Sequence, residues 1–169
     1  MKTMKLAALI AALTIADFGN HVCAQNEPSP AAPGQRPFDE PLHKKATDEA
    51  WAAFQAGRYT TAVTNADQCI ARFGEAANRS QVVLESERTT FPMGKVSEAD
   101  KKRIARYQIL HDVATCFLIK GWAEEKLGHK EEASKAYTEA KKYTHARSSR
   151  PTGESFWSPA EKASEPLPK

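Results

Sequence analysis

One spacing pattern occurs twice in the sequence, and it constrains the fold more than any other feature. Each copy has a Trp-Ala pair, a glycine six residues after the tryptophan, and an alanine five residues after the glycine. The copies are Trp51-Ala52, Gly57, Ala62 and, 71 residues later, Trp122-Ala123, Gly128, Ala133. A helix that ends at a glycine and a helix that begins soon after it form a hairpin. The sequence therefore predicts an all-α fold with two antiparallel helical hairpins of one design.

The first hairpin is predicted to begin near Thr47, whose hydroxyl can cap a helix with acidic residues in its first turn. Gly57 ends this helix, and a second helix follows from Tyr59 to Phe73, where Gly74 closes it. Residues 75–88 are predicted to form a separate short helix. The sequence Phe91-Pro-Met-Gly94 then breaks the helical pattern.

The second hairpin is predicted to contain one unusually long helix. Ser97 is a suitable N-cap, and apolar residues recur at steps of three and four from Ile104 onward. This pattern predicts a single helix of about 30 residues that reaches Leu127 and stops at Gly128. The final helix is expected over residues 130–146, which makes residues 46–146 the helical domain.

The two hairpins resemble tetratricopeptide repeats. In the second hairpin, the family's aromatic, small, alanine and aromatic positions are matched, and a further small residue follows. These residues are Phe117, Gly121, Ala133, Tyr137 and Ala140. In the first hairpin Gly57-x-Tyr59-x-x-Ala62 is typical of the family, but Ala46 and Ala66 replace the aromatics. Both copies lack the family's leucine and its closing proline, and the resemblance covers under half of the chain, residues 44–73 and 114–145.

The resemblance implies a concave groove, lined by the first helix of each hairpin, that binds peptides or partner proteins. The residues that it would place in the groove are Trp51, Phe54, Gln55, Trp122, Glu125 and Lys126. Aromatic side chains are effective anchors for a partner. The alternative is that both tryptophans belong to the core.

The N-terminus resembles a secretory signal of bacterial type. Two lysines precede an apolar run from Leu6 to Ala16, and Val22-Cys-Ala24 has the small residues of a cleavage site. The run is shorter than the about 20 residues that span a bilayer. Residues 1–24 are therefore predicted to be removed, which implies a periplasmic or secreted protein without stable membrane insertion. An uncleaved anchor and a lipid-modified Cys23 are the alternatives.

Proline-rich segments flank the predicted helical domain. Residues 25–45 contain five prolines and are expected to form a disordered, extended linker. Residues 147–169 are expected to form a polar, disordered tail. Within it, Ser158, Pro159 and Glu161 form a capping box that predicts a short terminal helix. The adjacent Phe156 and Trp157 are expected either to dock on the helices or to contact a partner.

Two cysteines follow the predicted signal, Cys69 and Cys116, one in each half of the helical domain. In an oxidising compartment they could form a disulfide that stabilises the fold by about 3–4 kcal/mol. The alternative is that both are small buried apolar residues.

No catalytic, metal-binding or cofactor motif occurs in the sequence. The histidines lack a metal-binding spacing, and the adjacent His111 and Asp112 point in different directions on a helix. The net charge of +3 is too small to predict binding to nucleic acid. We expect a non-catalytic adaptor of the cell envelope that binds a peptide or helix of a partner protein. The alternatives are a small hydrolytic enzyme or its accessory subunit, and a structural subunit that self-associates through Phe156 and Trp157.

Overall fold

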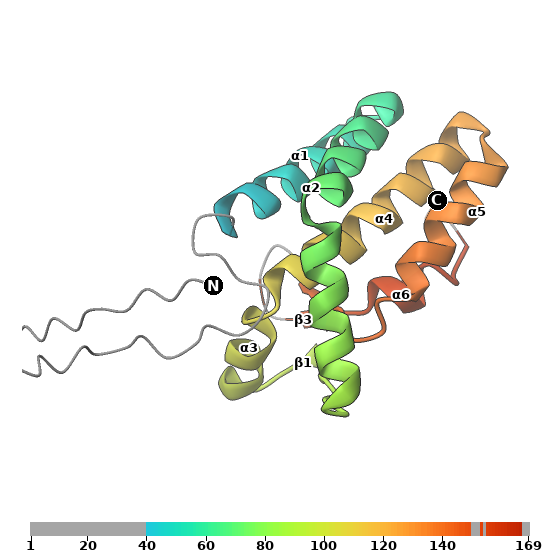
Figure 1. Cartoon of the computed structure of the whole chain (residues 1–169). Helices are drawn as coiled ribbons and strands as arrows, with labels where there is room; N and C mark the ends of the chain where they lie inside the picture. Colours follow the sequence, from blue (N-terminus) through green and yellow to red (C-terminus); the bar gives the residue numbers. More distant parts are fainter. Residues whose placement is uncertain (1–39, 150–152, 154, 167–169) are drawn as a thin grey trace, which may run out of the picture. The chain divides into compact units, whose positions relative to one another are not determined.

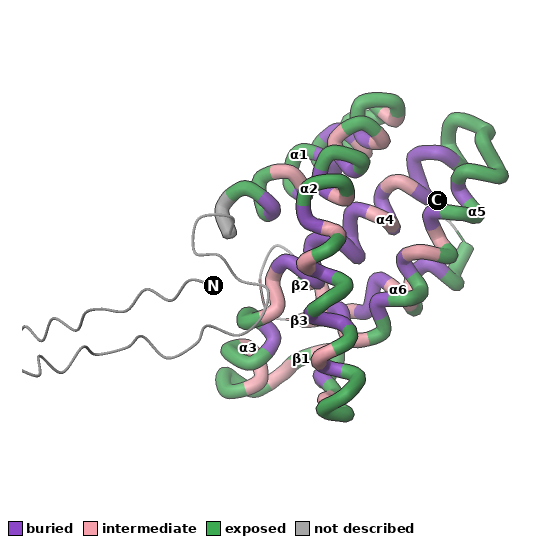
Figure 2. Tube along the Cα trace, in the orientation of Figure 1, coloured by how far each residue is buried: buried purple, intermediate pink, exposed green. Residues whose placement is uncertain are grey.

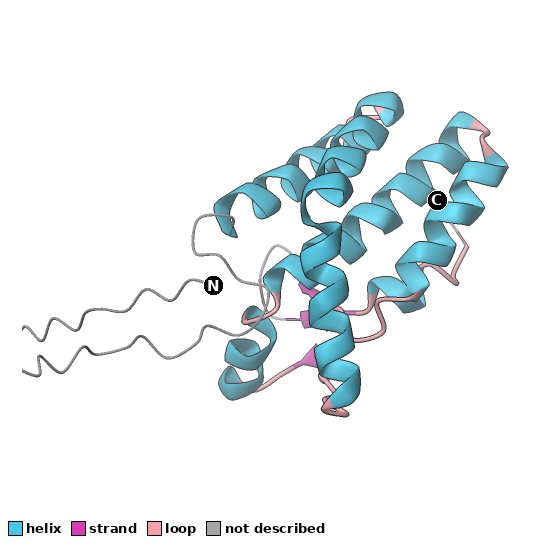
Figure 3. Cartoon of the chain, in the orientation of Figure 1, coloured by secondary structure: helices cyan, strands magenta, loops and turns pink. Residues whose placement is uncertain are grey.

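The computed structural model of the protein describes residues 40–149, 153 and 155–166, with side chains from Leu42 onward. Every described residue lies in one compact unit of the chain, residues 31–169. The predicted signal and residues 25–39 of the predicted linker lie outside the described residues. Figures 1 and 3 show the elements, which are α1 Glu40–Gln55, α2 Tyr59–Ser86, β1 Gly94–Lys95, α3 Glu98–Ala105, α4 Gln108–Leu127, α5 Lys130–Lys141, β2 Ser148–Ser149, β3 Ser155–Trp157 and α6 Pro159–Lys162.

The described part of the chain is mostly helical, as predicted, and it also contains a small sheet that the sequence did not predict. The strand order is β1-β3-β2, and both pairings are antiparallel. Phe156 of β3 lies opposite Gly94 on one side and Ser149 on the other. Strands of two or three residues are too short to show an alternating pattern, which explains why this sheet was missed.

Helix α4 forms the centre of the core. It packs against α1, α2, α5 and α6, and Figure 2 shows it buried along most of its length. Leu110, Leu118 and Ile119 on different sides of α4 are fully buried. A helix that is apolar all around is covered by its neighbours on all sides, so the other helices are arranged around α4.

Both predicted hairpin turns are present. Gly57 and Gly128 have φ angles of +71° and +82°, in the left-handed region that glycine adopts without a steric cost. The N–H of Gly128 donates to the carbonyl of Glu125, and the N–H of His129 donates to that of Glu124, which satisfies carbonyls at the end of α4. The local sequence thus fixes both turns.

Two residues of the repeat pattern, Gly121 and Tyr137, pack where α4 meets α5. Gly121 lies directly against the ring of Tyr137, and a Cβ atom at Gly121 would be 2.4 Å from Tyr137 Cε1. Ala62, Ala133 and Ala140 are buried. Tyr59 and Phe117 are half-buried against the main core. The small residues therefore allow a close approach that larger side chains would prevent.

The first helix begins earlier than predicted. It starts at Glu40, so the assignment of residues 40–45 to an extended linker was wrong, as was the capping role of Thr47. Thr47 lies inside α1, where its hydroxyl donates to the carbonyl of His43 at 3.0 Å. Pro41 lies in the first turn, where the backbone N–H groups have no partner within the helix. Proline lacks this N–H and is therefore tolerated at this position.

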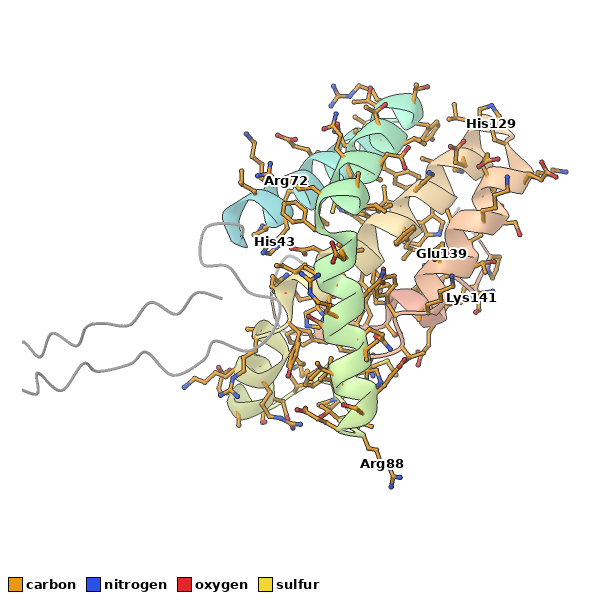
Figure 4. The ribbon with its side chains drawn as sticks, viewed as in Figure 1. His43, Arg72, Arg88, His129, Glu139 and Lys141 are labelled. Atoms are coloured by element: carbon orange, nitrogen blue, oxygen red, sulfur yellow. The ribbon has the colours of Figure 1, made fainter. Side chains whose placement is uncertain are left out.

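The prediction that Gly74 ends the second helix was also wrong, because α2 continues without a break to Ser86. Phe73 and Ala77, on either side of Gly74, are both buried in the core. This packing stabilises the helix on both sides of Gly74, although glycine has a low helix propensity. The helix ends two residues before Arg88, which has a φ angle of +51° and lies at the exposed end of α2 (Figure 4).

The predicted long helix of the second hairpin is two helices. Helix α3 ends at Ala105 and α4 begins at Gln108. In an uninterrupted helix the carbonyl of Ile104 would accept the N–H of Gln108. Here it accepts the N–H of Tyr107 at 3.0 Å and Nε2–H of the buried His111 at 2.8 Å. The side chain of His111 thus takes the place of a helical hydrogen bond, without a proline or glycine at the break.

The C-terminal segment docks on the helices. Helix α5 ends at Lys141, earlier than predicted, and Tyr143 and Ala146 after it are buried in the core. The predicted terminal helix is present as α6, and Ser158 caps it, because its hydroxyl accepts the N–H of Glu161 at 3.3 Å. Phe156 and Trp157 are half-buried and pack against the two apolar clusters of the fold.

The two cysteines are buried free thiols in the structure. The hydroxyl of Thr47 lies 3.3 Å from Sγ of Cys116 and 3.8 Å from Sγ of Cys69. Burial, together with the neighbouring Cys69, raises the pKa of Cys116 well above its ordinary value. A protonated thiol is a poor nucleophile. Both cysteines are buried in the main apolar core.

The contact between Gly121 and Tyr137 gives a test of the repeat packing. We expect Gly121→Ala to lower the free energy of unfolding by about 1–3 kcal/mol, because the added methyl group overlaps the tyrosine ring. Urea denaturation followed by circular dichroism measures this change. Gly74→Ala is the matched control, since its Cβ meets no atom closer than Ile70 Cγ2 at 3.9 Å. The control should raise stability by about 0.5–1 kcal/mol. Equal effects in the two variants would contradict the packing argument.

The buried His111 predicts a dependence of stability on pH. Burial lowers the pKa of His111 to about 4, against about 6.5 in an unfolded chain. Between these values the unfolded chain binds a proton that the folded chain does not. The free energy of unfolding should therefore fall as the pH falls from 6.5 to 4, by up to about 1.4 kcal/mol per pH unit. Urea denaturation at several pH values measures the slope, and His111→Gln should reduce it. An unchanged slope in the variant would contradict the prediction.

Candidate binding pocket

A pocket of about 670 Å³ lies between α1, α4 and the C-terminal segment that begins at β2. All three tryptophans of the chain line it, namely Trp51 of α1, Trp122 of α4 and Trp157 of β3. Its volume is within the range of pockets that bind small molecules or a few residues of a peptide. The convergence of the three tryptophans makes this pocket the candidate functional site.

The wall from α1 consists of Lys44, Thr47, Asp48 and Trp51. Lys44 lies three and four residues before Thr47 and Asp48, and Trp51 lies four and three residues after them, which places all four on one face of a helix. The hydroxyl of Thr47 is held by the carbonyl of His43, and Lys44 forms an ion pair with Asp48. The hydrogen bond to Asp48 is the main cause that raises the pKa of Lys44.

The wall from α4 consists of Gln108, Asp112, Thr115 and Trp122. These residues also follow a helical spacing, so one face of α4 is turned toward the pocket. The hydroxyl of Thr115 donates to the carbonyl of His111 at 2.8 Å and forms a hydrogen bond with the hydroxyl of Ser148. That second bond joins α4 to strand β2.

The third wall comes from the C-terminal segment. It includes Ser148 and Ser149 of β2, Ser155 and Trp157 of β3, and Lys162 at the end of α6. Trp157 packs against a cluster of buried side chains from α4, α5 and the end of α6, which contains Leu118, Trp122, Ala140 and Ala163. This cluster fixes the C-terminal segment against the helices.

Four aromatic rings pack against one another beside the pocket. Trp51 and Trp122, the equivalent tryptophans of the two repeats, have ring centroids 5.8 Å apart. Phe54 packs 5.8 Å from Trp122 and 6.2 Å from Trp51, and Tyr59 packs 5.6 Å from Phe54. Such contacts are favourable beyond the area that they bury. Trp122 is only 5% exposed, so it belongs to the core while one side of it borders the pocket.

A buried histidine holds the carboxylate of Asp112. Nδ1 of His43 forms a hydrogen bond with Oδ2 of Asp112, and Nε2 of Gln108 donates to Oδ1 at 3.0 Å. His43, labelled on α1 in Figure 4, is fully buried, and its ring meets the edge of Phe73 at 5.8 Å. Its Nε2 atom has no hydrogen-bond partner, the one such buried side-chain atom among the described residues. The pair therefore links α1 to α4 behind the pocket wall.

Each carboxylate of the pocket wall already has a partner. Asp48 pairs with Lys44, Glu165 pairs with Lys162 at 2.6 Å, and Asp112 is held by His43 and Gln108. The wall therefore has little net charge, although it contains several charged residues. The indole N–H groups differ in this respect, because within the described ranges none of the three tryptophans donates to an acceptor.

The described residues contain no group of three or more side chains that could hold a metal ion. His43 and Asp112 are arranged as a base and its orienting carboxylate, but the unpartnered Nε2 of His43 is buried against Phe73 with no hydroxyl or thiol bonded to it. A general base acts only on a group within hydrogen-bond distance.

The structure brings some of the predicted binding residues together and separates others. Trp51, Trp122 and Trp157 meet at the pocket, and Phe54 packs behind them. Gln55 and Lys126 are exposed at the far ends of α1 and α4 and do not line the pocket. Glu125 is also exposed, and it accepts the hydroxyl of Tyr137 at 2.6 Å. Phe156 packs on the main core instead of the pocket.

Sequence reasoning missed the polar side of the pocket. His43 fell in the predicted linker, and Asp112 was set aside because it neighbours His111 on the helix. The two neighbours do point in different directions, as predicted, and each is buried with a distant partner. Asp112 lies in a mostly apolar run from Ile109 to Ile119. A carboxylate buried in such a run needs a hydrogen-bonding partner. This requirement could have marked Asp112 as a residue with a partner elsewhere in the chain.

Comparisons with known proteins add no relative. A scan against models of protein families, a search of curated proteins and a search of solved structures each found no match. The likeness to tetratricopeptide repeats therefore stays a prediction from the residues. Within the part that the structure describes, no helix has the length and apolar character needed to cross a membrane.

The pairing of His43 with Asp112 predicts a non-additive effect on stability. Asp112→Leu alone should cost about 3 kcal/mol, because it leaves His43 buried without its partner. His43→Phe alone should have a similar cost, since the carboxylate then loses its histidine. The double variant His43→Phe, Asp112→Leu should recover much of the loss, because no buried polar group remains unpaired. Urea denaturation of the four proteins measures the coupling, and strictly additive costs would contradict it.

Proposed function

We propose that the protein is a non-catalytic binding module of the cell envelope that holds a segment of a partner protein in the three-tryptophan pocket. The observation that carries this proposal is the convergence of Trp51, Trp122 and Trp157 on one pocket. Tryptophan is enriched among the residues that dominate the energy of protein interfaces. The tetratricopeptide-like hairpins and the predicted secretory signal support the same function and location.

The size of the pocket favours an extended segment over a helix. One turn of a helix with its side chains occupies about 500 Å³, from a diameter of about 11 Å and a pitch of 5.4 Å. A pocket of about 670 Å³ therefore accepts little more than one turn of a helix. Part of the face that a partner helix would use is already covered by α6, which packs on both α4 and α5. An extended segment can insert a few residues and leave the pocket at both ends.

A hydrolytic enzyme, or its accessory subunit, is the second candidate. Three carboxylates line the pocket, from Asp48, Asp112 and Glu165, and Asp112 is oriented by His43. Pairs of carboxylates perform acid–base catalysis when at least one is free to exchange a proton with the substrate. In this pocket all three have partners within the protein, which makes binding the favoured function. Self-association through Phe156 and Trp157 has less support, because both side chains are half-buried within the fold.

Photo-crosslinking in cells tests the proposed function. A photoreactive amino acid is placed at Ser149, which is exposed and lines the pocket. The control position is Val82, which is 63% exposed on α2 and does not line it. We expect a partner protein to be linked from position 149 and not from position 82, and mass spectrometry of the linked peptides identifies it. Trp51→Ala in the same protein should remove the product, because it removes one wall of the pocket.

Two outcomes would contradict this function. The same products from positions 149 and 82 would indicate non-specific contact. An unchanged product in the Trp51→Ala protein would place the contact outside the pocket. The variant must retain the circular dichroism of the wild type, since Trp51 also packs on Phe54 and Trp122. Trp122 is not suitable for this test, because its burial makes loss of folding the expected result.

A further inference from the structure

We infer that Cys69 and Cys116 form a disulfide when the chain folds in an oxidising compartment. The bond joins α2 to α4, because Cys69 lies on α2 and Cys116 lies on α4. This inference goes beyond the proposed function and does not depend on the partner that the pocket binds. It shares with that function only the predicted secretory signal, since disulfides form and persist outside the reducing cytosol.

Both sulfur atoms contact the same hydroxyl group. Oγ1 of Thr47 lies 3.3 Å from Sγ of Cys116 and 3.8 Å from Sγ of Cys69. After burial, a hydrogen bond with the Cys69 thiol is the next cause that raises the pKa of Cys116. The two thiols are therefore neighbours, although they belong to different helices. Neighbouring sulfurs on two packed helices are the starting geometry for a disulfide.

The surroundings of the two sulfurs are compatible with the oxidised pair. Oxidation removes the two thiol protons, which are only weak hydrogen-bond donors. The hydroxyl of Thr47 still donates to the carbonyl of His43 at 3.0 Å, so this buried donor keeps its acceptor. A buried donor without an acceptor would destabilise the fold. Both cysteines belong to the main apolar cluster, where a disulfide replaces two small thiols without adding a polar group.

Burial restricts the pair to a bond within the chain. Both cysteines are fully buried, so in the folded protein neither sulfur is accessible to a second chain or to a large oxidant. Thiol–disulfide exchange also requires a thiolate, and burial raises the pKa of Cys116 well above its ordinary value. The bond therefore forms before folding is complete, and the folded chain then protects it.

The oxidant of this reaction is a second disulfide, such as oxidised glutathione or the active-site disulfide of a thiol oxidase. One cysteine thiolate attacks a sulfur of that disulfide and displaces a thiolate, which leaves a mixed disulfide on the chain. The second cysteine thiolate attacks the protein sulfur of the mixed disulfide and displaces the other thiolate. The two cysteines lose two electrons and two protons, and the oxidant gains two electrons and becomes two thiols.

Refolding of the reduced full chain in a buffer with oxidised glutathione tests the inference. Free thiols are then alkylated in urea, and the protein is digested with trypsin, which cuts after lysine and arginine. Cys69 and Cys116 lie in separate tryptic peptides, residues 59–72 and 107–120, and Cys23 lies in a third, residues 6–36. We expect mass spectrometry to find peptide 59–72 linked to peptide 107–120 in most of the chains.

The time at which the oxidant is added tests the role of burial. Oxidised glutathione that is added to the folded, reduced protein should produce the link at least about tenfold more slowly than glutathione that is present during refolding. The physical reason is that the folded chain holds both thiols away from solvent and in the protonated form. The same peptide analysis, at several times after addition, measures the two rates.

Thermal unfolding tests whether the bond fits the native packing. The linked protein should melt roughly 10 °C above the protein refolded in a phosphine reductant, because the link lowers the entropy of the unfolded chain. Cys69→Ala is the matched control. Its melting temperature should be the same in both buffers, since only one cysteine of the pair remains.

Three outcomes would overturn the inference. The first is recovery of peptides 59–72 and 107–120 as separate, alkylated peptides after refolding with oxidised glutathione. The second is glutathione attached to either cysteine, or links between chains, because the two sulfurs then do not meet within one fold. The third is a linked protein that melts at or below the reduced one. None of these results concerns the pocket, so the photo-crosslinking experiment decides the proposed function independently.

Discussion

His111 and Asp112 are neighbours on the buried helix α4, and each needs a hydrogen-bonding partner away from water. Asp112 accepts a hydrogen bond from His43 of α1. His111 donates to the carbonyl of Ile104 at the end of α3 and accepts the N–H of Arg147 after α5. Adjacent side chains on a helix point in different directions. Asp112 therefore holds α1 on one side of α4, and His111 holds α3 and the C-terminal segment on another. The arrangement around α4 depends on these bonds as well as on apolar packing.

The same segments form the walls of the pocket. Helix α1 and the C-terminal segment are held to α4 by the contacts of His43 and Arg147, and each brings one tryptophan to the face of α4 that carries Trp122. The apolar cluster around Leu118 then joins Trp157 to Trp122. A site on elements that are fixed in this way is preorganised, which reduces the entropy lost on binding. The rigidity of the pocket and the buried polar bonds are thus parts of one arrangement.

The candidate site could be predicted in part. The equivalent positions of Trp51 and Trp122 in the repeat indicated that they belong together, and their rings do meet. Trp157 was a candidate only as an exposed aromatic in a polar tail. The polar wall was not predictable from spacing, because His43 and Asp112 are 69 residues apart and neither belongs to a motif. Only folding brings them into contact, and only the partner explains why a carboxylate is tolerated inside an apolar helix.

The sequence by itself determined the features that depend on neighbours along the chain. These are the helical hairpins, the left-handed turns at Gly57 and Gly128, and the cap of α6 at Ser158. The tertiary structure alone decided where helices continue and where they break. Helix α2 passes through Gly74 because the residues beside it are buried, and the helix before α4 ends because His111 takes the carbonyl of Ile104. For residues other than proline, local helix propensities differ by at most about 1 kcal/mol. Buried contacts between distant segments are worth several kcal/mol, so the distant contacts prevailed.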